Sequence, residues 1–130
     1  MEDKICLDTD FLVEFLRNKE NALNWIKENK DQKELATTII NIYELYYGAF
    51  KIDSEKELAA VEIIKNSLRI LDLDEKTARD AGKITAQLES AGNMLDFRDI
   101  LIGSIALSNN FALKTNNKKH FERIDGLDIS

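Results

Sequence analysis

The segment KICLDTDFLVEFL, residues 4–16, decides the fold of this chain. Its first four residues are a short β-prone run, and the polar elbow Asp8-Thr9-Asp10 separates them from apolar residues spaced as in a helix. In an open, mostly parallel sheet, ligands collect outside the carboxyl ends of the strands, so a carboxylate at such an elbow points into a crevice. Asp8 is therefore in a position where it could bind a ligand or take part in catalysis.

The same elbow also has a purely structural interpretation. Asp8, Thr9 or Asp10 can cap the following helix by accepting a hydrogen bond from one of its first backbone N–H groups. For Asp10 we favour capping, whereas for Asp8 we favour a functional role.

Strand-like and helical patterns alternate along the rest of the chain. We predict strands at 35–38, 69–73 and 111–115, an edge strand at 127–129, and helices at 21–30, 39–50, 54–67, 74–91 and 99–107, with a short helix ending at Phe121. Crossover helices between parallel strands cover both faces of the sheet with right-handed connections. The pattern predicts an α/β fold, a three-layer α/β/α sandwich around a central, mostly parallel sheet of four to five strands. No repeat or linker is visible, so we expect one domain over residues 1–130.

Composition and charge narrow the class of protein. The chain is 44% apolar with five Gly and no Pro, which fits a helix-rich globular core. No apolar stretch approaches the ~20 residues needed to span a bilayer, and no secretory signal pattern opens the chain. We therefore expect a cytoplasmic protein without a membrane partner. The single cysteine, Cys6, lies in the first strand and is interpreted as a buried structural thiol.

The net charge of −6 argues against a simple nucleic-acid binder, because nonspecific binding of phosphates draws on clustered Lys and Arg. It does not exclude a nuclease, whose carboxylates attract cations that hold the scissile phosphate. One basic cluster near the C-terminus could touch a nucleic-acid backbone or be a solvated helix face; it comprises Lys114, Lys118, Lys119 and Arg123 around His120.

Three carboxylates stand where an α/β chain would build a metal site. Asp8 ends the first strand, Glu44 lies about a turn inside the helix at 39–50, and Asp99 opens an apolar helix where it needs a partner. Hydrolysis of a phosphodiester requires oxygen ligands for Mg²⁺ or Mn²⁺. We expect Asp8 and Asp99 to be direct ligands, and Glu44 to be a water-mediated ligand or a base. Clustered like charges raise one another's pKa, so metal binding should stabilise the fold.

Two further features allow alternative interpretations. Asp96 precedes Asp99 by three residues and is either an N-cap or a member of the site. Tyr43, Tyr46, Tyr47 and Phe50 are either dimer surface or core.

Four segments of the chain, in this order, resemble the PIN-domain ribonucleases, and in particular the VapC-type toxins of type II toxin–antitoxin pairs. Residues 5–12, ICLDTDFL, resemble the opening LDTN elbow of the family, and residues 44–48, ELYYG, resemble its EL-x-x-G segment. Residues 99–107, DILIGSIAL, resemble its D-x-x-IA helix, and residues 114–121, KTNNKKHF, resemble its T-x-N/D-x-x-HF segment. The resemblance runs end to end and implies one PIN-like nuclease domain.

This resemblance implies that Asp8, Glu44 and Asp99 bind Mg²⁺ or Mn²⁺ for cleavage of RNA. Asn117 matches a position of the family that is Asp in many members and Asn in others. The identity of the fourth metal ligand is therefore left open among three residues: Asp96, Asn116 and Asn117. The resemblance also implies a homodimer and a cognate antitoxin that inserts a segment toward the acidic pocket.

Two rival functions use the same residues. In an aspartate-nucleophile phosphatase, Asp8-Thr9-Asp10 would open the active site, but Asp96 and Asp99 then precede Lys114 in the wrong order and Glu44 has no role. In a catalytically inactive regulatory module, the acidic pocket would only hold a cation.

Overall fold

The computed structural model describes residues 3–130, and its central feature is one parallel sheet with the strand order β3-β2-β1-β4. The strands are β1 (Lys4–Leu7), β2 (Glu34–Thr38), β3 (Arg69–Leu71) and β4 (Ala112–Lys114). The order places β1 between β2 and β4, so the elbow after β1 lies near the middle of the carboxyl edge of the sheet.

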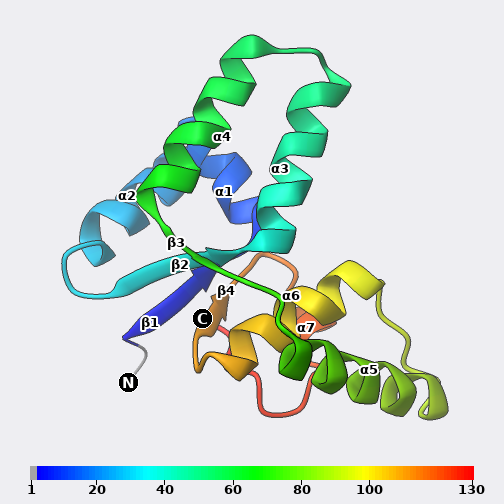
Figure 1. Ribbon diagram of the computed structural model, residues 1–130. Helices are drawn as coiled ribbons and strands as arrows, with labels where there is room; N and C mark the ends of the chain where they lie inside the picture. The colour runs from blue at the N-terminus through cyan, green and yellow to red at the C-terminus, as the bar shows by residue number, and fades with distance from the viewer. Residues whose placement is uncertain (1–2) are drawn as a thin grey trace.

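Seven helices cover the two faces of the sheet in the described part of the chain (Figure 1). One face carries α1 (Thr9–Leu16), α2 (Glu20–Asn29), α3 (Ile39–Lys51) and α4 (Glu55–Ser67), and the other carries α5 (Glu75–Ser90), α6 (Phe97–Ser108) and α7 (Lys118–Phe121). The predicted three-layer α/β/α sandwich with a parallel sheet is confirmed.

Alternation along β1 explains how the sheet divides the core. Ile5 and Leu7 pack in the cluster under α1–α4, whereas Cys6 packs in the cluster under α5–α7. All three side chains are fully buried, as expected for a strand covered on both faces. Burial raises the pKa of the Cys6 thiol far above its ordinary value, which supports the structural role predicted for it.

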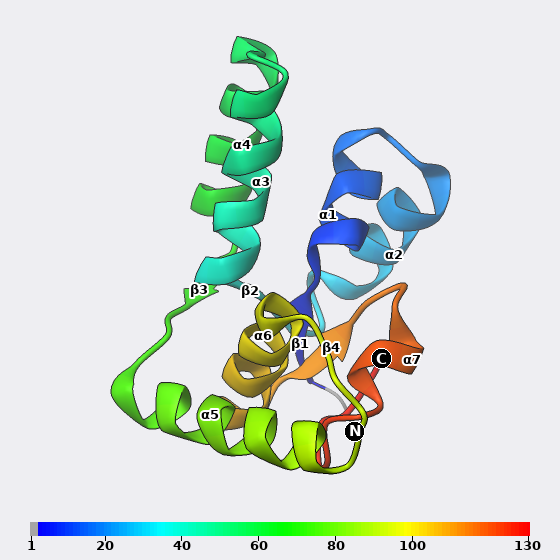
Figure 2. The ribbon, with the colours of Figure 1, turned by 90° about the vertical axis from the view of Figure 1, so that its right-hand side faces the viewer.

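The helices α3 and α4 form a hairpin that extends well beyond the sheet (Figure 2). Tyr43, Tyr47 and Phe50 on α3 are all more than half exposed, so they are not core residues. Tyr46 is half-buried and packs against the cluster under α1–α4. Tyr43, Tyr47 and Phe50 are therefore surface residues, and the core interpretation is wrong for these three.

Several element ends differ from the prediction by one or two residues; β3, for example, ends at Leu71 rather than at residue 73. The helix α6 begins at Phe97 rather than Asp99, because Asp96 caps it by accepting a hydrogen bond from the Arg98 N–H at 2.9 Å. The predicted edge strand at 127–129 is wrong, since the segment makes only an isolated bridge between Ile129 and Leu113. No helix within residues 3–130 combines the length and the apolar character needed to cross a membrane.

A close contact in α6 generates a stability prediction. A Cβ on Gly103 would lie 2.4 Å from Ile124 Cδ1, so Gly103→Ala should force Ile124 to shift. Overpacking costs about 1–3 kcal/mol, and the gain in helix propensity offsets about 1 kcal/mol of it. We expect Gly103→Ala to lower the free energy of unfolding by about 1 kcal/mol in urea titrations.

The double variant provides the control. Ile124→Val removes the overlapping methyl group, so Gly103→Ala combined with Ile124→Val should be more stable than the sum of the two single effects predicts. Strictly additive effects would contradict the close approach of these two positions.

Candidate metal centre

Asp8 lies at the end of β1 with only 4% of its surface exposed. Its Oδ1 accepts hydrogen bonds from the Thr9 N–H at 2.9 Å and from Asn41 Nδ2 at 3.0 Å, and its Oδ2 accepts one from Thr115 Oγ1 at 2.7 Å. Asp8 is also the N-cap residue of α1. The capping and functional interpretations of this residue are therefore compatible.

Burial raises the pKa of Asp8 above its ordinary value. The three hydrogen bonds oppose this shift, and the negative charge of Asp99 adds to it. The ionised form of Asp8 is therefore unfavourable at this position unless a positive charge lies nearby.

Asn41 is a fully buried residue that joins three segments of the site. Its Nδ2 donates to Asp8 Oδ1 at 3.0 Å and to Thr9 Oγ1 at 2.9 Å. Its Oδ1 accepts from the backbone N–H and the hydroxyl of Thr38 at 3.1 and 2.8 Å, which closes a capping box at the start of α3. The sequence analysis missed this role, although Thr38 followed three residues later by a polar side chain was a signal for the box.

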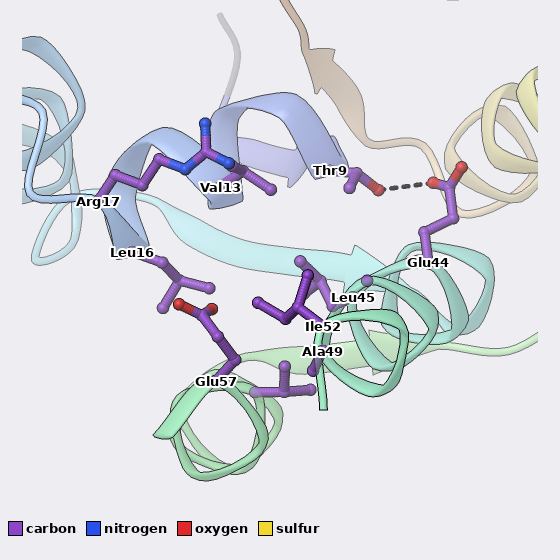
Figure 3. A pocket seen from close by; sticks show the side chains of 11 residues that line it. Thr9, Val13, Leu16, Arg17, Glu44, Leu45, Ala49, Ile52 and Glu57 are labelled. Atoms are coloured by element: carbon purple, nitrogen blue, oxygen red, sulfur yellow. Dashed lines mark hydrogen bonds between the residues drawn. The ribbon is translucent and has the colours of Figure 1, made fainter. Parts of the chain in front are cut away.

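Glu44 lies on α3 and is about one-fifth exposed. Its Oε1 accepts a hydrogen bond of 2.6 Å from the Thr9 hydroxyl, which Figure 3 shows as a dashed line. Its Oε2 lies 4.0 Å from Arg98 Nη1. Asn41, Thr9 and Glu44 thus form a hydrogen-bonded chain that orients Glu44, and Thr9 is a second residue whose role the sequence analysis missed.

Asp99 lies in the first turn of α6 and is half-buried. Its Oδ2 is 3.8 Å from His120 Nδ1. Burial raises the pKa of Asp99, and the charges of Asp96 and Glu44 raise it further, against smaller opposing effects of His120 and Arg98. Asp99 therefore interacts electrostatically with both Asp8 and Glu44.

Asp10 is not the N-cap residue of α1, so the capping role favoured for it is wrong. The Oδ2 of Asp10 accepts a hydrogen bond from the Asn116 N–H at 3.1 Å. Its Oδ1 is buried without a hydrogen-bond partner among the described residues. Burial and the neighbouring Asp8 charge raise the pKa of Asp10. The elbow therefore presents a second carboxylate with an unsatisfied oxygen.

The three candidates for the fourth ligand are all at the surface. Asp96 caps α6, and the side chain of Arg98 donates to both of its carboxylate oxygens, which lowers the pKa of Asp96. The side-chain amide of Asn116 donates to the carboxylate of Glu14. Asn117 donates its backbone N–H to Thr115 Oγ1 at 3.0 Å. A metal-binding role stays a prediction for each of them.

The acidic residues fit a hard divalent cation. Within residues 3–130, no three His, Cys, Asp or Glu side chains are close enough to form a ready-made metal cluster. Mg²⁺ takes only one or two carboxylates directly and keeps several waters, so a loose set of oxygen donors is compatible with it. The orphaned oxygen of Asp10 and the raised pKa values of Asp8 and Asp99 are two further signs of a missing positive charge.

A groove of about 200 Å³ leads away from this site between α1, α3 and α4 (Figure 3). Thr9 and Glu44 line one end of it, and Arg17 and Glu57 line its other part. Between them the walls are largely apolar, formed by Val13, Leu16, Leu45, Ala49, Ile52 and Val61. This α1–α3 groove therefore joins an apolar surface to the acidic residues.

The buried position of Asn41 leads to a test of its role. Asn41→Leu would leave the hydrogen-bonding groups of Asp8 and Thr38 without this partner inside the core. We expect it to lower the free energy of unfolding by about 2–3 kcal/mol in urea titrations. Asn109→Ala is a matched control, because it removes a half-buried amide with one bond to the Ile105 carbonyl and should cost about 1 kcal/mol or less. Equal effects of the two changes would contradict a special role for Asn41.

The raised pKa of Asp8 predicts how stability depends on pH. Between its ordinary and its raised pKa, Asp8 holds its proton in the folded state but loses it in the unfolded state. The contribution of Asp8 to the free energy of unfolding is therefore greatest below the ordinary pKa of an aspartate. It is lost as the pH rises through the raised pKa that Asp8 has in the folded state. In EDTA at pH 7 we expect Asp8→Asn to be about 0.5–2 kcal/mol more stable than the unchanged protein, with a smaller gain at about pH 4.

Asp96→Asn is the control for this measurement, because the pKa of Asp96 is lowered by Arg98 and its contribution is lost as the pH falls. Its effect should have the opposite sign. Urea titrations across this pH range would decide the matter, and a pH-independent effect of Asp8→Asn would show that burial of its charge is not the cause.

Comparison with known proteins shows a family match over nearly the whole chain and relatives of similar length. The family model described as PIN domain matches residues 5–127. Ribonuclease VapC2 of Haemophilus influenzae is 31% identical over 95% of this chain and 94% of its own length. The tRNA(fMet)-specific endonuclease VapC of Salmonella typhimurium is 33% identical over 97% of this chain and 96% of its own length.

Solved structures show the same fold. VapBC2 from Rickettsia felis, bound to a DNA fragment from its promoter, superposes with a TM-score of 0.89 at 28% identity and covers 97% of this chain and 96% of the matched one. DNA-bound VapBC from Salmonella typhimurium superposes with a TM-score of 0.87 at 32% identity and covers 100% and 98%. The resemblance noted in the sequence is confirmed, and the chain belongs to the PIN-domain family, within its VapC group.

Proposed function

We propose that this chain is a metal-dependent endoribonuclease, the toxin of a toxin–antitoxin pair, which hydrolyses RNA with Mg²⁺ or Mn²⁺. The observation that supports the proposal is the coupling of three carboxylates from segments far apart in sequence: Asn41 and Thr9 connect Asp8 to Glu44 by hydrogen bonds, and the charge of Asp99 raises the pKa of Asp8. The names of the VapC relatives support the same activity. The nuclease is one PIN-like domain over residues 1–130 and acts in the cytoplasm.

The roles of the residues follow from their surroundings. Asp8 and Asp99 hold the cation, which supplies Lewis acidity and lowers the pKa of water. Glu44 accepts the proton of the attacking water, because its Oε1 is oriented by Thr9 and its Oε2 is only loosely paired with Arg98. Asn41 keeps Asp8 in one orientation through its Nδ2. The water oxygen then bonds to phosphorus, the bond from phosphorus to the leaving ribose oxygen breaks, and that oxygen takes a proton from solvent.

Asp96 and Asn117 complete the site at its rim. We assign them to contacts through water rather than to direct ligation, because both are exposed and Asp96 is engaged by Arg98. Asn116, tied to Glu14 and Asp10, is the weaker candidate.

The phosphatase alternative has less support. It requires a lysine near the nucleophile, but the described contacts of the Lys114 ammonium are with the rings of Phe11 and Trp25 at 5.7 and 5.3 Å. It also leaves the bond between Thr9 and Glu44 without a function.

A cognate antitoxin is the proposed inhibitor. The structural neighbours from Rickettsia felis and Salmonella typhimurium are VapBC complexes bound to DNA, which supports a partner of this kind. The α1–α3 groove offers apolar walls that end at Glu44, so a bound segment could place a basic side chain against the acidic residues.

The exposed aromatic residues of α3, Tyr43, Tyr47 and Phe50, support a homodimer.

The test is cleavage of total cellular RNA by the purified chain, free of any partner, with Mg²⁺ or Mn²⁺ and with or without EDTA. We expect cleavage only with metal. Asp8→Asn and Asp99→Asn should each lower its rate at least about a hundredfold, since metal ligands supply several kcal/mol of transition-state stabilisation. Asp80→Asn changes a carboxylate on α5 that pairs with Lys76 and is not one of the site residues, so it is the matched control and should leave the rate within about twofold.

Two outcomes would contradict the proposal. Intact RNA together with hydrolysis of a phosphomonoester that depends on Asp8 would favour the phosphatase. Stabilisation by Mg²⁺ with no hydrolysis of either substrate would favour the regulatory module.

A further inference from the structure

Phe97 and Arg98 form an exposed pair at the start of α6, directly before Asp99. Phe97 is 68% exposed, the highest value among the large apolar side chains of the described residues. The guanidinium carbon of Arg98 lies 5.9 Å from the centre of the Phe97 ring, so the ring and the cation are neighbours on one surface. An aromatic ring and a guanidinium plane are the two groups on which proteins stack unpaired RNA bases.

Arg98 also connects this surface to the acidic site. Its Nε and Nη2 donate to the carboxylate oxygens of Asp96 at 3.1 and 3.2 Å. Its Nη1 lies 4.0 Å from Glu44 Oε2. Asp96 is itself held by the backbone, because its Oδ1 accepts from the Arg98 N–H at 2.9 Å. The guanidinium is thus fixed in plane and reaches the residue proposed to activate water.

Stability does not account for this arrangement. The side chains of Arg98 and Asp96 are 41% and 46% exposed, and an ion pair this exposed adds little to the stability of a fold. A phenylalanine left in water adds nothing through burial. By contrast, a chain with a net charge of −6 needs a local cation to hold RNA beside its acids, and Arg98 can donate to a phosphate through Nη1, which is not engaged in its two bonds to Asp96.

We propose that Phe97 and Arg98 bind the nucleotide next to the scissile phosphate. Arg98 contacts the phosphate of this nucleotide, and the Phe97 ring stacks on its base. Stacking requires a base that is not paired, so the pair selects RNA that is single-stranded at the point of cleavage. This inference rests on the proposed nuclease function and deepens it by giving the site a substrate preference.

Binding is measured first, on the Asp8→Asn protein with Mg²⁺, so that the RNA stays intact. The probe is a fluorescently labelled RNA oligonucleotide, either single-stranded or annealed to its complement, followed by anisotropy. Phe97→Leu should weaken binding of the single strand about tenfold, with little change for the duplex. Arg98→Gln should weaken binding of both forms about tenfold, because both present phosphates. Phe97→Tyr keeps the ring and should restore binding.

Matched controls are available in the same chain. Ile63→Ala changes a 67% exposed apolar side chain on α4, and Arg79→Gln changes an exposed arginine on α5. Neither should alter RNA affinity. In the enzyme with Asp8 intact, Phe97→Leu should raise KM about tenfold with nearly the same kcat, whereas a merely structural defect would lower the unfolding midpoint and kcat.

The outcomes separate the alternatives. Unchanged RNA affinity in Phe97→Leu and Arg98→Gln would overturn the inference. A shift from dimer to monomer in sedimentation, with RNA affinity retained, would also overturn it and make Phe97 a contact with a second copy of the chain. Loss of RNA binding in these variants, with no cleavage by the unchanged protein, would uphold the pair while the proposed nuclease function fails.

Discussion

A buried carboxylate at the end of the central strand is the constraint on which the rest of the structure depends. Asp8 is almost inaccessible to water, and an ionised group left there without partners would be costly. Its three donors come from the start of α1, from α3 and from the residue after β4, namely Thr9, Asn41 and Thr115. The carboxyl ends of β1, β2 and β4 therefore have to meet at this point.

The same constraint links stability to function. The charge of Asp99 raises the pKa of Asp8, the charge of Glu44 raises the pKa of Asp99, and the buried Asp10 oxygen has no partner among the described residues. A divalent cation bound here, as proposed, would relieve these unfavourable terms, because it would be the positive charge that the hydrogen bonds cannot supply. On this proposal the fold gives up stability at the site to gain affinity for metal, as is common at active sites.

Most of the fold could be predicted from local patterns. The alternation of strands and amphipathic helices and the buried helix after Asp99 depend on residues that are close in sequence, so local patterns are enough to predict them. The ends of helices are harder to predict from sequence. Asp96 and Asp99 could each begin α6, and only the hydrogen bond that Asp96 accepts from the Arg98 N–H identifies Asp96 as the N-cap. For the same reason Asp10 was interpreted as a cap, although Asp8 performs that role.

The sequence by itself determined the parallel α/β architecture, the elbow at Asp8 and the identity of the acidic residues, because each depends on periodicity or on a short motif. Only the tertiary structure decided which groups meet. Thr115 reaches Asp8 across 107 positions and Asn41 reaches it across 33, and no local pattern specifies such contacts. The exposure of Phe97 and the direction of Arg98 were likewise decided by packing, since a side chain at a helix start can face core, solvent or site depending on what surrounds it.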